Sequence, residues 1–214
     1  MYRLALDFLQ QITGCSKKEN QMINNKILLP IFILVALVQL SVPAKMIFDR
    51  EDILNSGKEY KFKTKSIYPN DPFRGKYITL SYHEDVIEVE NGADWTEGEI
   101  IYVSLTTDRE GFAKIKSVSK ENLVNNQDFL KTKVRYIVGN GSNKLTIDYP
   151  FERFYMEESK AYDAELIYRE SQPDTSQITY ALVSIKDGEA VLKDVLINGV
   201  PIKEIVINER ENQK

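Results

Sequence analysis

The sequence predicts a mainly β protein of the α+β class, in which an N-terminal transmembrane helix precedes an antiparallel β-rich domain with one helix. Three observations lead to this prediction. One long apolar run lies near the N-terminus, turn residues separate alternating segments after it, and a single later stretch has helical character. We expect a cytoplasmic tail over residues 1–26, an anchor over 27–44 and an extracytoplasmic domain over 45–214.

The apolar run is ILLPIFILVALVQLSVPA, from Ile27 to Ala44. As a helix rising about 1.5 Å per residue it would reach about 27 Å, close to the thickness of the bilayer core. Two other interpretations compete. A buried core helix should have a polar face, and none appears before Gln39. A cleaved signal peptide is the stronger rival, because Val42 to Ala44 resembles a small-residue cleavage site.

The charges around the run favour a cytoplasmic N-terminus. Lys17, Lys18 and Lys26 precede it, whereas the basic residues that follow are mixed with acidic ones. We therefore expect a single-pass membrane protein with its C-terminal domain outside the cytoplasm. Translation starting at Met22 would leave a short basic leader directly before the run.

The segments that follow the run are read in order. Asp49 to Asn55 is polar and compatible with a helix that stops at Ser56 and Gly57. Tyr60 to Lys65 alternates with the period of a strand, SIYPNDPF supplies turn residues, and Lys76 to Tyr82 forms the next strand.

Three hairpins follow from their turn residues. EIIYVSL and FAKIKSV flank TTDREG, VRYIV and KLTIDY flank GNGSN, and ITYALVSI and AVLKDVLI flank KDGE. The single helix predicted in the domain runs from Glu157 to Glu170, and Pro173 closes it.

The chain also has a faint internal echo. IYVSLTTDREGFAKIKSV resembles TYALVSIKDGEAVLKDV, and DPFRGKY resembles YPFERFY. A duplication of one β unit would give two related β halves, although hairpins also converge on such patterns.

Composition excludes several function classes. Basic and acidic residues nearly balance, 28 against 32, so the chain lacks the charge of a nucleic-acid binder. His83 is the only histidine, Cys15 the only cysteine, and the apolar run separates them, so a Cys/His metal site or dyad is excluded. No phosphate loop or nucleophile elbow occurs. We expect no cofactor, no metal and no catalytic residue.

One motif carries a family resemblance. Gly75, Tyr77, Leu80 and Tyr82 stand in the spacing G-x-Y-x-x-L-x-Y, which resembles the bacterial GDYXXLXY family of uncharacterised membrane-anchored proteins. QLSVPA, GKEYKFKT, WTEG, GFAKI and FERFYMEE follow the order of that family's other motifs. The aspartate of the family motif is Lys76 here, so a mechanism that needs this carboxylate would fail in this chain.

The resemblance implies a partner and leaves the role open. Members look like companions of polytopic membrane proteins, so we expect a non-catalytic assembly or binding subunit anchored in the membrane through residues 27–44. The resemblance also implies a place in the bacterial envelope, in the cytoplasmic (inner) membrane. A small-molecule ligand, if there is one, stays unknown. The alternative is an envelope hydrolase or transferase that uses Glu157 or Glu158 with Arg74 and Tyr77, which requires these groups to converge in a cleft.

The candidate ligand or structural residues come from the motif strand and its echo. In a strand, Leu80 and Tyr82 face the core while Tyr77 points the other way. Arg74 and Arg153 either pair with acidic residues of the predicted helix, which we favour, or bind an anionic group. The full set is Arg74, Gly75, Tyr77, Leu80, Tyr82, Arg153, Tyr155, Glu157 and Glu158.

Overall fold

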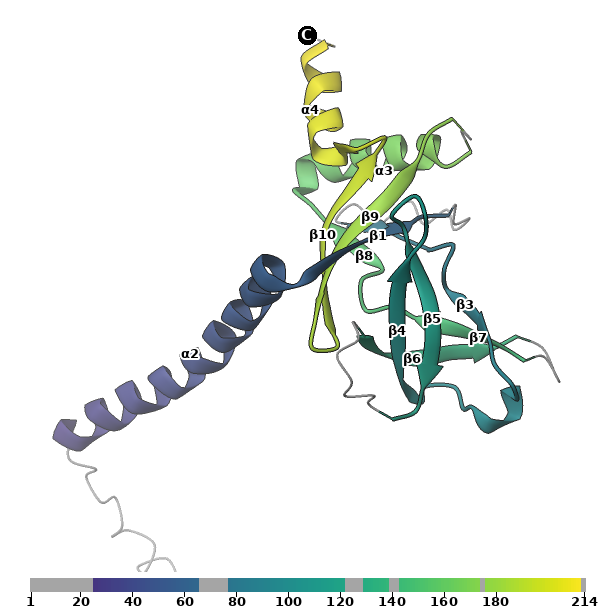
Figure 1. The fold of residues 1–214 in the computed structure, drawn as a ribbon. Helices are drawn as coiled ribbons and strands as arrows, with labels where there is room; N and C mark the ends of the chain where they lie inside the picture. Colours follow the sequence, from purple (N-terminus) through teal and green to yellow (C-terminus); the bar gives the residue numbers. More distant parts are fainter. Residues whose placement is uncertain (1–24, 66–76, 122–128, 139–142, 174–175, 213–214) are drawn as a thin grey trace, which may run out of the picture. The chain divides into compact units, whose positions relative to one another are not determined.

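A computed structural model describes residues 25–65, 77–121, 129–138, 143–173 and 176–212 (Figure 1). The chain divides into two compact units, Met1–Phe48 and Asp49–Lys214. This boundary lies a few residues after the predicted start of the domain at residue 45. Arg74 and Gly75, two of the predicted site residues, lie outside the described residues.

The predicted anchor and the polar segment after it form one helix, α2 (Asn25–Ser56), which contains Pro30 and Pro43. Its last residues, from Asp49 on, belong to the second unit. There Ile53 is buried, the Arg50 guanidinium donates to the Ala190 carbonyl at 3.0 Å, and Asp52 forms an ion pair of 2.6 Å with Lys186.

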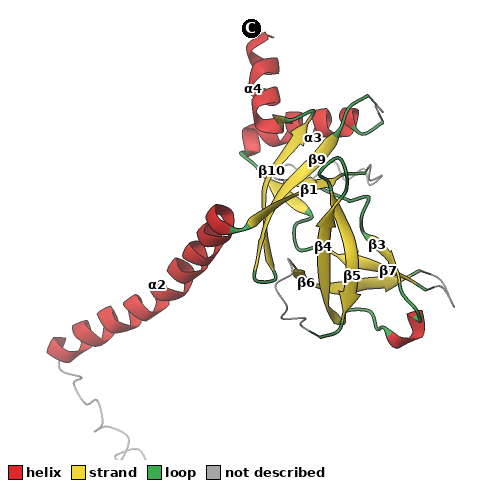
Figure 2. Ribbon diagram, in the orientation of Figure 1, coloured by secondary structure: helices red, strands yellow, loops and turns green. Residues whose placement is uncertain are grey.

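The second unit is built on antiparallel sheets, as predicted (Figure 2). One sheet has the order β1-β9-β10-β11 and another the order β3-β7-β6-β4-β5, while β2 and β8 form a two-stranded ribbon. The strands are β1 (Lys58–Lys63), β2 (Tyr77–Thr79), β3 (Val86–Glu88), β4 (Ile100–Thr107), β5 (Ala113–Ser119), β6 (Phe129–Ile137), β7 (Lys144–Asp148), β8 (Arg153–Tyr155), β9 (Thr179–Lys186), β10 (Glu189–Ile197) and β11 (Val200–Pro201).

The three predicted hairpins are confirmed. They are β4–β5, β6–β7 and β9–β10, each paired in antiparallel register. The tightest turn holds Asp187 at φ 51° and Gly188 at φ 84°, the backbone conformation that an Asp-Gly pair favours. Local turn chemistry is therefore enough to fix these connections.

Helix α3 (Glu158–Ser171) confirms the predicted helix, with Ala161, Ala164 and Tyr168 buried. The expectation of a single helix in the domain was wrong, because α4 (Ile202–Asn212) follows β11 and buries Ile202 and Val206. A single turn of 3₁₀ helix, η1 (Gly92–Asp94), precedes β4. The two α-helices lie together at one end of β9 and β10 (Figure 1), where Arg210 of α4 pairs with Asp163 of α3 at 2.6 Å.

Four aromatic rings form the centre of the core. Phe62, Tyr82, Tyr149 and Phe151 are each at most 3% exposed, and their ring centroids lie 5.0 to 5.6 Å apart. The buried phenols are satisfied by main-chain oxygens: Tyr82 donates to the Phe151 carbonyl at 2.7 Å and Tyr149 to the Glu84 carbonyl. The cluster therefore ties β1 and the motif segment to the residues just before β8.

Alkaline pH should destabilise the domain through its buried tyrosines. Burial, as the main cause, raises the pKa of Tyr82 and Tyr149 above the usual value and the pKa of Tyr168 to about 12. An unfolded tyrosine ionises near pH 10, so the unfolded state loses protons first and stability falls as pH rises from about 10 to about 12.

The check is urea unfolding at a series of pH values, followed by the fluorescence of Trp95, the only tryptophan. Tyr168→Phe, which removes one of these groups, should flatten the decline in the midpoint. A midpoint that stays constant from pH 10 to pH 12 would contradict the prediction.

Candidate functional site

The β2–β8 ribbon brings three of the predicted site residues together. Tyr77 and Tyr155 are direct partners across the two strands, with ring centroids 5.4 Å apart, and the Arg153 guanidinium lies 5.1 Å from the centre of the Tyr77 ring. A hydrogen bond to the Tyr155 side chain is the main cause that raises the pKa of Arg153, so the guanidinium stays charged. Tyr155 is 61% exposed. The cluster offers a cation and an aromatic face to solvent.

Arg153 lies against the two tyrosines, and among the described residues no acidic side chain of the predicted helix pairs with it. Glu157, directly before α3, instead pairs with Lys160 at 2.8 Å and accepts a hydrogen bond from Ser159. Lys160 lowers the pKa of Glu157, so this carboxyl group is anionic at neutral pH and unsuited to donate a proton. Glu158 begins α3 and is exposed.

Leu80 and Tyr82 face the core, as predicted, and are 1% and 2% exposed. Neither side chain can reach a ligand at the surface. These two positions of the motif are explained by packing, and Tyr77 is the described motif residue that stays half-exposed.

A second feature, which the sequence analysis missed, is a shallow groove of about 330 Å³ on the larger sheet. We call it the β6 groove. Its lining residues are Ile100, Lys131, Thr132, Lys133, Asp148 and Pro150. Lys131 and Lys133 make no ion pair or side-chain hydrogen bond with any described residue, and Ile100 is 47% exposed.

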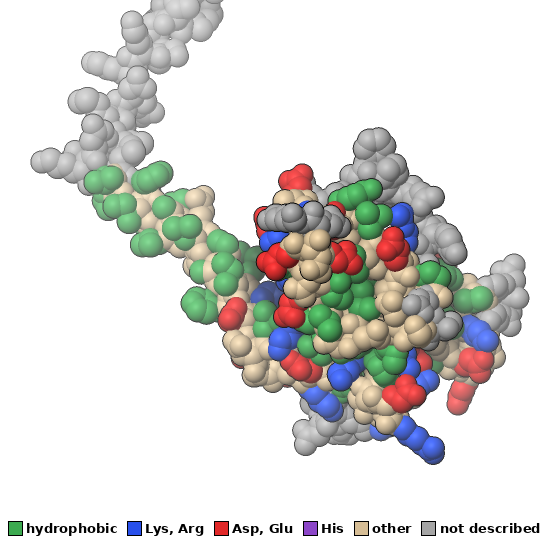
Figure 3. Space-filling model, turned by 90° about the horizontal axis from the view of Figure 1, so that it is seen from above, with side chains coloured by type: hydrophobic (Ala, Val, Ile, Leu, Met, Phe, Trp, Pro, Cys, Tyr) green, Lys and Arg blue, Asp and Glu red, His purple; other side chains and the backbone are tan. Residues whose placement is uncertain are grey.

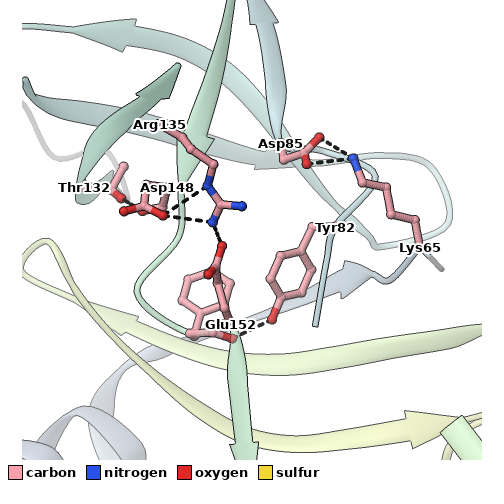
Figure 4. Close-up of polar contacts among 8 residues, drawn as sticks. Lys65, Tyr82, Asp85, Thr132, Arg135, Asp148 and Glu152 are labelled. Carbon is pink, nitrogen blue, oxygen red and sulfur yellow. Dashed lines mark hydrogen bonds and ion pairs between the residues drawn. The ribbon is translucent and has the colours of Figure 1, made fainter. Parts of the chain in front are cut away.

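An ion-pair network borders the groove (Figure 4). Arg135 pairs with Asp148, at 2.8 Å, and also with Glu152, so the negative charge of Asp148 is already compensated. The Thr132 hydroxyl donates to the Asp148 carbonyl, which fixes the wall between the two lysines. The β6 groove can therefore accept an anionic group beside an apolar one.

Neither feature has the chemistry of a metal centre or an acid catalyst. Within the described residues, no group of three or more His, Cys, Asp or Glu side chains could hold a metal ion. Among the described residues, the carboxyl groups with a shifted pKa are those of Asp52, Glu99, Asp108 and Glu157. In each of them a hydrogen bond is the main cause, and it lowers the pKa below the usual value.

One feature of the sequence indicates the β6 groove. Lys131-Thr132-Lys133 alternates in a strand, which places both lysines on one face. The rest of the lining comes from other segments, as Ile100, Asp148 and Pro150. These residues reach the groove only because β6 pairs with β4 and β7.

Comparison with known proteins gives one match. The profile of a family described as GDYXXLXY protein matches residues 39–195, which is most of the chain. No curated protein and no solved structure matches significantly. The match spans the end of α2, the ribbon and the β6 groove.

Proposed function

We propose, from the premise that the chain belongs to the GDYXXLXY family, that it is a single-pass membrane-anchored subunit with a non-catalytic, extracytoplasmic domain. That domain assembles with a polytopic membrane protein. The role is one of binding, and the β6 groove and the β2–β8 ribbon are its candidate contact sites.

The observation that carries the proposal is the exposed apolar surface of helix α2. The most apolar 18-residue stretch of its candidate membrane span, Leu29–Ser56, has a mean hydropathy of 2.2, and none of that stretch is buried. Side chains such as Phe32, Leu37 and Phe48 are 60 to 73% exposed, and Figure 3 shows hydrophobic side chains along the helix. Exposing a large apolar side chain to water costs about 1.5–3 kcal/mol, so a lipid environment is strongly favoured.

The length of the apolar part of α2 also supports an anchor over a cleaved leader, because the apolar region of a signal peptide is usually about 7 to 15 residues long. The apolar part of α2, Leu29 to Phe48, reaches about 30 Å at 1.5 Å per residue, the thickness of a bilayer core. The basic residues before the span favour a domain outside the cytoplasm.

The binding role follows from the surface of the domain. The two lysines of the β6 groove lack acidic partners in the described chain, and Tyr155 and Arg153 expose an aromatic and a cationic group. Aromatic and arginine side chains are enriched where proteins contact one another. A partner that carries acidic groups on an extracytoplasmic loop would complement both sites.

Anchoring makes a direct prediction. The mature protein should stay with the membrane fraction during an alkaline carbonate wash and should leave it only in detergent. Immunoblotting of the two fractions, with a known peripheral protein as control, checks this. Release by carbonate would mean that the segment had been cleaved and that the proposed topology was wrong.

The partner is tested by mild-detergent purification through a C-terminal tag, followed by quantitative mass spectrometry. We expect a polytopic protein at about one to one. The double variant Lys131→Glu/Lys133→Glu should reduce its recovery at least about tenfold, a change of about 1.4 kcal/mol.

The matched control is Lys144→Glu/Lys193→Glu, which changes the charge equally but alters lysines that already pair with Glu88 and Glu59. Recovery of the unaltered protein alone would refute the assembly role. Equal losses in both double variants would refute the β6 groove as the contact site and leave assembly standing.

A further inference from the structure

We infer that residues 58–119 and 129–197 are two copies of one β unit, fused in a single chain, that have exchanged their first strands. The first copy consists of β1, β2, β4 and β5, and the second of β6, β8, β9 and β10. The inference rests on strand register, and it is independent of the proposed function.

The exchange is visible in the sheet order. β1, from the first copy, pairs with the hairpin β9–β10 of the second, and β6, from the second copy, pairs with the hairpin β4–β5 of the first. The registers correspond residue by residue. Lys63 lies opposite Tyr180 in one sheet, and Lys131 lies opposite Tyr102 in the other.

The residues at corresponding positions of the two first strands also agree. They read Phe-Lys-Thr-Lys over residues 62–65 and Leu-Lys-Thr-Lys over residues 130–133. Phe62 and Leu130 are both buried in the core, and the two threonines, Thr64 and Thr132, are 6% and 7% exposed. Each first strand also makes an isolated parallel bridge to the hairpin tip of its own copy, Lys61 with Phe112 and Leu130 with Gly188, and the two bridges are offset from each other by one residue.

The two hairpins share an irregularity. In β4–β5 the pairing skips Lys116, between Ile115 and Ser117, and in β9–β10 it skips Lys193, between Leu192 and Asp194. The second strands read AKIKSV and AVLKDV from Ala113 and Ala190, so the skipped residue is the same lysine of the repeat.

The β2–β8 ribbon marks the axis that relates the copies. Tyr77 and Tyr155, which close the echoed segments DPFRGKY and YPFERFY, lie directly opposite each other. When a two-fold axis crosses an antiparallel strand pair, equivalent residues meet in this way. The spacing agrees too, because Tyr77 precedes Tyr102 by 25 residues and Tyr155 precedes Tyr180 by 25 residues.

Convergence explains single features but not their combination. A bulge with a lysine protects the edge of a sheet and arises independently in many proteins. It does not explain why the bulge, the Lys-Thr-Lys segments and the facing tyrosines all fall at corresponding places. The copies differ where each has its own insertion, β3 and η1 in the first and β7 and α3 in the second.

The first test trades residues 113–118 with residues 190–195 in the full-length protein in detergent. If the second strands are equivalent, the traded protein should unfold cooperatively, with a midpoint within about 5 °C of the unaltered protein, followed by Trp95 fluorescence. The control trades residues 113–118 with residues 191–196, which misplaces the bulge and reverses the faces, and it should not fold. A register-matched trade that is as damaging as the shifted one would overturn the inference.

The second test uses the native strands. A protease site is inserted between Glu121 and Phe129, and the purified protein is cut in detergent. Because each copy lacks its own first strand, the C-terminal piece, which has no anchor, should stay with the micelle-bound N-terminal piece on size-exclusion chromatography. Release of a folded, monomeric C-terminal piece would show that the copies are self-contained, and the exchange would be wrong.

Discussion

Replacing Tyr82 with alanine is expected to lower the free energy of unfolding by about 3–5 kcal/mol, enough to leave much of the domain unfolded. The ring is 2% exposed and packs edge-on against Phe62 and Tyr149. Its removal opens a cavity at the centre of the aromatic cluster and leaves the Phe151 carbonyl without the phenol that binds it. Urea unfolding followed by Trp95 fluorescence measures the loss.

Two companion variants separate the contributions. Tyr82→Phe keeps the ring and should cost about 1–3 kcal/mol for the unsatisfied carbonyl. Tyr77→Ala removes the other tyrosine of the same motif, which is half-exposed on the ribbon, and should cost about 1 kcal/mol. If Tyr77→Ala destabilised the domain as much as Tyr82→Ala, the division of the motif into a core face and a surface face would be incorrect.

Gly57→Ala should cause the second largest loss, about 2–3 kcal/mol, because the added methyl group has no space. A Cβ at this position would lie 2.4 Å from the Ile53 carbonyl oxygen and 3.2 Å from two backbone atoms of Ile185. These are main-chain atoms, so a side-chain rotation cannot relieve the contact. The Gly57 amide also donates to the Ile53 carbonyl at 2.9 Å, which closes α2 before β1 begins.

Gly111→Ala is the comparison for this position. Gly111 has φ 85°, where alanine is strained by about 1–2 kcal/mol, but nothing lies within 4 Å of the added carbon. Thermal unfolding of both variants in the same detergent compares strain alone with steric overlap. A Gly57→Ala protein that is as stable as the unaltered one would mean that the junction between α2 and β1 relaxes freely.

Sequence reasoning succeeded where the determinants are local. Asp187 and Gly188 specify their turn by their own backbone preferences, and the period of two correctly assigned Leu80 and Tyr82 to the core. The helix from Glu158 to Ser171 follows in the same way from the spacing of its small inward residues. The family resemblance adds to these local patterns and is confirmed over residues 39–195.

Sequence reasoning failed where distant segments meet or where local preferences conflict. Ile, Val and Asn in α4 have weak helical preference, so the segment after the Asn198-Gly199 turn was not recognised as a helix. Its signal was the i, i+4 spacing of Ile202 and Val206 after Pro201. The β6 groove needs three strands in register, and no single segment contains that information.

The pairing of β1 with β9 has a consequence for biosynthesis. Lys63 leaves the ribosome long before its partner Tyr180, and loop closure over so many residues slows folding. During synthesis the first strand therefore stays unpaired until β9 has been made, and it is open to chaperones and proteases. Any truncation before β9 should yield an unfolded fragment that proteases degrade, so only chains that extend through β9 accumulate.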